Sequence, residues 1–186
     1  MNEVFTSKAD ALKLLQKKIK NSKIEKIFDF TVREWLEKDG KILREISNTF
    51  KNASVIVRSS ALGEDSIKST YAGAYQSILN VDPKNKKKLR DAINLVIKSY
   101  RQKRNYNEKN QILIQTQSQQ IQISGVVFTK TPEHGAPYYI INYEKGKITT
   151  TVTQGLSSQV VKIFRNILVK NLPQEWRNLI KSIKTV

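Results

Sequence analysis

The apolar residues near the start of the chain recur at helical spacing. Leu12, Leu15 and Ile19 lie on one face of a predicted helix, and Ser7 with Asp10 three residues later resembles a capping box at its start. This pattern predicts a first amphipathic helix close to the N-terminus.

Two more helices are predicted further along. Thr31 and Glu34 form a better capping box, and Phe30 and Trp35 occupy the two positions of a hydrophobic staple around it. Apolar residues spaced over residues 41–50 predict a third helix. The first third of the chain is therefore expected to be helical.

Strand signals come next. Ser54–Val57 is short and β-branched and leads into Arg58, and residues 74–81 have the character of a second strand. The pair Asp82–Pro83 is typical of an N-cap with proline at the first helical position. We expect the helix that it starts to end near Arg104.

The second half of the chain has the pattern of strands. Short breaks containing Gly, Pro or Ser separate five strand-like runs, QILIQTQ, ISGVVFTK, APYYIINY, KITTTVTQ and QVVKIF. A last amphipathic helix is predicted after Pro173. The whole pattern predicts an α+β fold of two unequal lobes, a helical lobe with a small sheet over residues 1–109 and a β-rich lobe over residues 110–186.

The composition adds a strong positive charge and a lack of cysteine. The chain has 186 residues, a formal net charge of +17 and 39% hydrophobic residues, enough for a core. The charge fits either a polyanionic partner such as nucleic acid or solvent faces covered with lysine. A chain without cysteine is usual in a reducing cytosol, so we expect a cytoplasmic protein. No run approaches 18 apolar residues, so no membrane partner is expected.

The usual catalytic constellations are missing, and one loop remains as a candidate. His134 is the sole histidine and lies in a predicted turn, so a histidine triad or a histidine-rich metal site finds no support. Arg58, at the end of a predicted strand, is followed by a loop with Gly63 and several serines. A fixed guanidinium beside hydroxyls and accessible backbone N–H groups suits phosphate. From spacing alone, a phosphate loop and an ordinary surface loop remain alternatives.

The stretch VIVRSSALGEDSIKSTYAGAYQSILNV, residues 55–81, resembles the nucleotide-binding segment of the phosphoenolpyruvate synthase and pyruvate phosphate dikinase family. Further resemblances follow in the family's order over essentially the whole chain. They are SKADALKLL (7–15), ILIQTQ (112–117), SGVVFTKTP (124–132) and QGLSSQVV (154–161).

The resemblance implies an ATP-grasp fold, in which two lobes clamp ATP, and a reaction that depends on stabilising phosphoryl charge. It implies that Lys8 and Arg58 neutralise the phosphates, with Arg58 as the catalytic residue, and that backbone near residues 115–118 holds the adenine. The nucleotide-binding residues that it implies are Lys8, Arg58, Ser59, Gln115, Thr116, Gln117, Ser118 and Thr129. The implied cofactors are ATP and Mg²⁺, with the metal ligands expected beyond residue 186.

The sequence departs from the family at several positions. Thr6 and Ser7 stand where the family has two glycines before its lysine, Ser158 replaces a glutamate, and Asn142 lies where many relatives have an acidic residue. The chain also ends before the family's metal-binding Asp-Ile-Glu strand and its Gln-x-Arg strand. We therefore expect the N-terminal part of a longer enzyme, inactive by itself. The whole enzyme would phosphorylate a histidine on a separate swivelling domain, for transfer to a small-molecule acceptor.

Two kinds of phosphoryl acceptor remain as alternatives. One is pyruvate, as in ordinary phosphoenolpyruvate synthase-like activity. The other is an amide nitrogen, because FTVREW (30–35) and INYEKGKITTTVTQG (141–155) resemble a subgroup that includes the L-glutamine kinase of bacterial capsule modification. A rival class, a basic nucleic-acid-binding module, would use one cluster of aromatic and basic residues: Tyr100, Arg101, Lys103, Arg104 and Tyr106.

Overall fold

The computed structural model describes residues 7–63, 65–66, 69–70, 75–103, 106–146 and 159–184. The chain forms two compact units, Met1–Ile19 with Lys23–Gln117 and Lys20–Ser22 with Ser118–Val186. The sequence pattern predicts a division after residue 109. In the structure the strand over residues 111–116 pairs within the sheet of the first unit, so the division between the two units lies after it.

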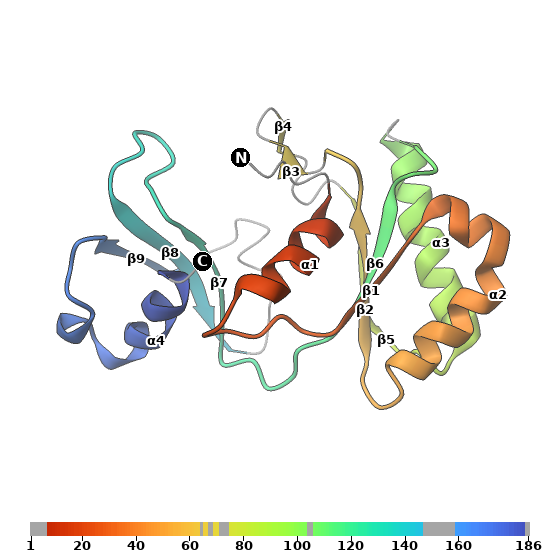
Figure 1. Cartoon of the computed structure of the whole chain (residues 1–186), viewed down its shortest axis with the longest axis horizontal. Helices are drawn as coiled ribbons and strands as arrows, with labels where there is room; N and C mark the ends of the chain where they lie inside the picture. Colours follow the sequence, from red (N-terminus) through yellow and green to blue (C-terminus); the bar gives the residue numbers. More distant parts are fainter. Residues whose placement is uncertain are drawn as a thin grey trace. The chain divides into compact units, whose positions relative to one another are not determined.

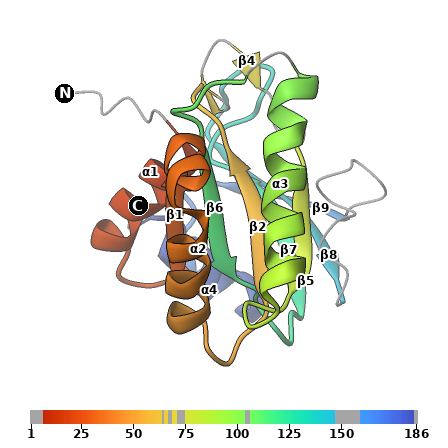
Figure 2. The same cartoon turned by 90° about the vertical axis from the view of Figure 1, so that its right-hand side faces the viewer.

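The first unit is built on a four-stranded antiparallel sheet with the order β1-β6-β2-β5. Its strands are β1 (Ile27–Thr31), β2 (Val55–Ser60), β5 (Ser77–Val81) and β6 (Gln111–Thr116). Helices α2 (Val32–Thr49) and α3 (Lys86–Gln102) cover one face of this sheet, and α1 (Lys8–Lys18) lies on the other (Figure 1, Figure 2). Two short strands, β3 (Asp65–Ser66) and β4 (Ser69–Thr70), pair with each other.

Successive side chains of a strand point to opposite faces of the sheet, so the position of each residue in β2 and β6 decides whether it faces α1 or the pair α2 and α3. Four apolar residues of the two strands lie in the core shared with α2 and α3: Val55, Val57, Ile112 and Ile114. The register pairs Ile56 with Gln115 and Arg58 with Leu113. It therefore places four polar residues on the face of α1, Arg58, Ser60, Gln111 and Gln115, whereas Ser59 and Thr116 lie on the face of α2 and α3.

The start of α2 follows the sequence prediction. The Thr31 side chain accepts from the Glu34 N–H, Glu34 accepts in return from the Thr31 N–H, and the rings of Phe30 and Trp35 stack with centroids 5.7 Å apart. The second and third predicted helices correspond to the two parts of α2, which meet at a kink where Lys38 has non-helical backbone angles (φ −142°, ψ 32°). One other expectation was wrong, because β1 precedes α2 where only helix was expected.

The predicted cap of α3 was also wrong. Asn85 is the N-cap, and its side chain accepts from the Lys88 N–H at 3.0 Å. The Asp82 carboxylate instead accepts from the Lys84 N–H at 2.9 Å, in the turn before the helix. Pro83 therefore lies in this turn and not at the first helical position.

The second unit has a three-stranded antiparallel sheet with the order β7-β8-β9. Its elements are β7 (Ile123–Phe128), β8 (Tyr138–Lys145), β9 (Gln159–Phe164), a 3-10 turn η1 (Val169–Asn171) and α4 (Gln174–Ile183). Alternate residues of β8 pack on α4. The rings of Tyr143 and Trp176 meet edge to face, with their centroids 4.9 Å apart. The strand expected over residues 147–154 lies outside the described residues.

None of the helices in the described part of the chain is long and apolar enough to cross a membrane.

Candidate functional site

Arg58 lies inside β2 and not at its end, because the strand continues to Ser60. Its side chain is half-buried on the α1 face, and its Nη1 donates to Gln115 Oε1 on β6 at 2.9 Å. Gln115 is paired with Ile56, so the bond runs diagonally between neighbouring strands. The amide orients the guanidinium without itself cancelling the positive charge.

Ser59 is 2% exposed and points to the opposite face from Arg58, towards the helices. The structure therefore does not bring the Ser59 side chain together with the guanidinium. Ser60, which the sequence analysis included only as a loop hydroxyl, lies on the Arg58 face instead.

Lys8 is the first residue of α1, and the helix start is tied to the end of β2. The Ser7 side chain caps α1 by accepting from the Asp10 N–H at 3.2 Å, as the sequence predicted. The next residue, Ala9, donates its N–H to Ser60 Oγ at 2.9 Å. The turn that carries Lys8 thus lies against the strand that carries Arg58.

Two buried polar residues outside the predicted nucleotide-binding set, Tyr100 and Asn110, fix the end of β2. The Tyr100 hydroxyl accepts from the Ser60 N–H at 3.0 Å and donates to the Gln111 carbonyl at 2.6 Å. The Asn110 side chain accepts from the Leu62 N–H at 3.1 Å, just after the strand. The sequence marked Tyr100 only as a member of the aromatic and basic cluster, and no signal marked the role of its hydroxyl in the sheet.

The end of β6 is already engaged in the sheet. The Thr116 N–H donates to Lys26 O and the Gln117 N–H donates to Ser54 O, both at 2.9 Å. The Gln117 side chain binds Asn80 twice, accepting from its N–H at 2.7 Å and donating to its Oδ1 at 2.8 Å. Asn80 has a φ of 56°, so Gln117 holds a left-handed residue at the end of β5.

Ser118 and Thr129 both belong to the second unit, and both are exposed. Thr129 follows β7 and borders a hollow of about 510 Å³. The other residues around this hollow are Pro137, Tyr139, Arg165, Asn166, Ile183 and Lys184. Arg165 Cζ lies 5.6 Å from the centroid of the Tyr139 ring. With Arg165 and Lys184 around it, the hollow has cationic walls as well as polar ones.

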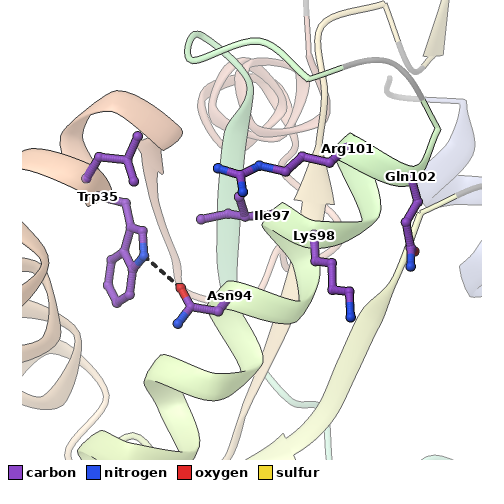
Figure 3. Close-up of a pocket in the computed structure, with 7 residues that line it drawn as sticks. Trp35, Asn94, Ile97, Lys98, Arg101 and Gln102 are labelled. Atoms are coloured by element: carbon purple, nitrogen blue, oxygen red, sulfur yellow. Dashed lines mark hydrogen bonds between the residues drawn. The ribbon is translucent and has the colours of Figure 1, made fainter.

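A second hollow, of about 600 Å³, lies between α2 and α3 (Figure 3). Its residues are Trp35, Leu36, Asn94, Ile97, Lys98, Arg101 and Gln102. Trp35 Nε1 donates to Asn94 Oδ1 at 3.1 Å, as Figure 3 shows. None of the residues expected to hold a nucleotide borders this groove.

The aromatic and basic cluster at the end of α3 does not form a stacking surface. Tyr100 is fully buried and bonded to both central strands, so its ring is unavailable to a base. Arg101 lies over the ring of Tyr106 at 4.7 Å, which occupies one face of the other aromatic residue. Arg104 lies outside the described residues. This arrangement weakens the hypothesis of a nucleic-acid-binding module.

Within the described part of the chain, no three His, Cys, Asp or Glu side chains gather in a way that could hold a metal ion. We assign no step to a metal.

The fold is that of an ATP-grasp-like domain. Residues 1–177 match the family model described as "Pyruvate phosphate dikinase, AMP/ATP-binding domain", and the chain belongs to this family. The same fold occurs in the dinucleotide-forming acetyl-coenzyme A synthetase 1 of Ca. Korarchaeum cryptofilum, solved in complex with coenzyme A, Ca-AMPCP and HgCl+. The TM-score is 0.53 at 10% identity, over 90% of this chain and 62% of that chain. No curated protein shows a significant match to this sequence.

Proposed function

We propose that this chain is the ATP-binding part of a phosphotransferase of the phosphoenolpyruvate synthase type. In this proposal Lys8 and Arg58 bind the phosphates of ATP. The phosphoryl group passes to a histidine on a separate domain and then to a small-molecule acceptor. Membership of the family supports the choice of ATP as the ligand. The resemblance in the motifs supports the assignment of Lys8 and Arg58 to its phosphates.

The observation that carries the proposal is the bond from the Ala9 N–H to Ser60 Oγ. It holds the first turn of α1 against the end of β2, so that Lys8 and Arg58 come from adjoining elements on one face of the sheet. Two cations carried by adjoining elements suit the spread of negative charge over a triphosphate. Because Arg58 is further held by Gln115, little reorganisation of the arginine is needed when the phosphate binds.

The adenine contacts are proposed at the end of β6, over residues 115–118. Two backbone N–H groups of this stretch, those of Thr116 and Gln117, already donate within the sheet. The base edge is therefore left to the other polar groups of the stretch, Ser118 among them.

The acceptor is proposed to be pyruvate or an amide nitrogen. FTVREW, one of the two stretches that resemble the amide-phosphorylating subgroup, serves in this structure as the capping box and staple of α2. The structural role of these residues is therefore to build the helix start. A phosphotransfer assay of the full-length enzyme with pyruvate and with L-glutamine distinguishes the two.

A titration with ATP, AMP and adenosine, beside a gel shift with duplex and single-stranded DNA at two salt concentrations, tests the proposed function. We expect ATP to bind more tightly than AMP, and AMP more tightly than adenosine, because each phosphate adds contacts to the two cations. A nucleic-acid module would instead bind DNA strongly, with steep salt dependence, and would not distinguish the three small ligands. Equal affinity for ATP and adenosine would overturn the proposed roles of Lys8 and Arg58.

A further inference from the structure

Gln111, the first residue of β6, lies where α1, β2 and β6 meet. Its amide oxygen is 2.5 Å from Ser7 Oγ and 3.4 Å from Ser60 Oγ, and its amide nitrogen donates to Asp10 Oδ1 at 3.3 Å. One side chain therefore joins the N-terminal turn of α1 to the end of β2.

The backbone of Gln111 is held as firmly as its side chain. Its carbonyl accepts from the buried Tyr100 hydroxyl, which in turn accepts from the Ser60 N–H. Gln111 is also paired in register with Ser60 on one side and with Thr31 on the other. The sheet thus sets the position of Gln111 relative to β2. The side-chain amide of Gln111 in turn holds the start of α1 in place relative to the sheet.

Gln111 and Gln115 lie on the same face of β6, because they are four residues apart in a strand. Gln115 binds the guanidinium of Arg58. Gln111 binds Ser7, just before Lys8, and Asp10, two residues after it. From one strand, therefore, one neutral amide orients the Arg58 guanidinium directly and another holds the helical turn that carries Lys8.

We propose that Gln111 is a positioning residue that sets where Lys8 lies relative to Arg58. This inference rests on the proposed function, since it assumes that both cations bind the phosphates of ATP. Without the Gln111 amide, the first turn of α1 keeps its bond from Ala9 to Ser60 but loses its links to β6. Lys8 then samples positions from which it does not reach the phosphates together with Arg58.

A double-mutant cycle between Gln111→Leu and Lys8→Ala tests the inference, with ATP and adenosine affinities as the readout. We expect Gln111→Leu to weaken ATP binding by on the order of tenfold and to leave adenosine binding unchanged. In the Lys8→Ala background the same change should cost much less, because the side chain that it positions is gone. Gln16→Leu, on the exposed side of α1, is the matched control and should change neither affinity.

The unfolding midpoint of each variant in denaturant shows whether the fold is kept. A second variant, Ser7→Ala, removes only the bond between Ser7 Oγ and the Gln111 amide oxygen from the contacts of Gln111, with a smaller change in side-chain volume. Ser7→Ala should weaken ATP binding in the same direction as Gln111→Leu. Additive losses in the cycle, or equal losses for ATP and adenosine, would overturn the positioning role while leaving the proposed function intact. An unchanged ATP affinity in Lys8→Ala alone would overturn the proposed role of Lys8 and the inference with it.

Discussion

Arg58 Nη1 and Gln115 Oε1 lie 2.9 Å apart on neighbouring strands of the first unit. A neutral amide therefore orients the guanidinium that we propose to bind phosphate. Replacing the amide by a carboxylate keeps the shape and changes the charge. We expect Gln115→Glu to form an ion pair with Arg58 and to weaken ATP binding by about tenfold or more.

The same variant should retain its stability, because a carboxylate beside a half-buried arginine is well tolerated. The measurement is an ATP titration with a denaturant unfolding curve of the same sample. Glu substituted for the exposed Gln16 adds the same charge on α1 and serves as the control. Unchanged ATP affinity in Gln115→Glu would contradict a phosphate-binding role for Arg58.

Tyr100→Phe should destabilise the first unit. The hydroxyl is fully buried and serves the Ser60 N–H and the Gln111 carbonyl, so its removal leaves a buried donor without its acceptor. The expected loss is about 1–3 kcal/mol in the free energy of unfolding. Urea denaturation measures this loss, and Tyr138→Phe, whose ring is 39% exposed, should cost far less. Equal effects of the two changes would contradict the bridging role of Tyr100.

The capping box of α2 predicts a pH-dependent contribution to stability. The pKa of Glu34 lies below its ordinary value of 4.5, chiefly because its carboxylate accepts from the Thr31 N–H. A carboxyl group with a lowered folded-state pKa stabilises the fold above its unfolded-state pKa, and this contribution is lost as the pH falls through the folded-state pKa. We therefore expect Glu34→Gln to be less stable than the wild type at pH 7.

The two unfolding midpoints should converge as the pH falls below 4.5. Glu37→Gln, at an exposed position of the same helix, is the control and should change the midpoint little at either pH. A difference for Glu34→Gln that persists unchanged in acid would show that the charge of the carboxylate is not what stabilises the helix start.

Gly125, in the motif SGVVFTKTP, is required by close packing of strands. A Cβ at this position would lie 2.4 Å from the Asn142 carbonyl oxygen and 3.1 Å from Tyr143 Cα, both on β8. We expect Gly125→Ala to lower the unfolding midpoint of the second unit, because backbone atoms must shift. Gly40→Ala is the control, since its Cβ would meet nothing within 4 Å and α2 should gain about 0.5–1 kcal/mol. A Gly125→Ala variant as stable as the wild type would contradict this account of the motif glycine.

The sequence predicted most elements of the fold, and the errors have local causes. The Thr31 capping box and the Phe30–Trp35 staple are contained within a few residues, so their pattern is visible without any tertiary contact. The strand β1 was missed because it is only five residues long and leads directly into α2. The cap of α3 was misplaced because Asp82 and Asn85 both suit an N-cap, and the choice between them depends on the turn.

The candidate site could be predicted only in part. The motif resemblance selected Lys8, Arg58 and Gln115, but the alternation along β2 puts Ser59 on the opposite face. Gln111 and Gln115 alternate with apolar residues in the run QILIQTQ, a pattern that predicts a strand and nothing more. Their partners lie about 50 to 100 residues away in the sequence, so no local pattern could assign the amides of Gln111 and Gln115 to α1 and β2.

The most direct test of the central claim is an ATP titration of Arg58→Ala and Lys8→Ala beside Lys17→Ala. Lys17 is also on α1 and is exposed, so its removal changes the net charge equally while Lys8 and Arg58 stay in place. We predict losses of ATP affinity of at least about tenfold for Arg58→Ala and Lys8→Ala, and little change for Lys17→Ala. Equal affinity in all three variants and the wild type would contradict the claim that Lys8 and Arg58 bind the phosphates.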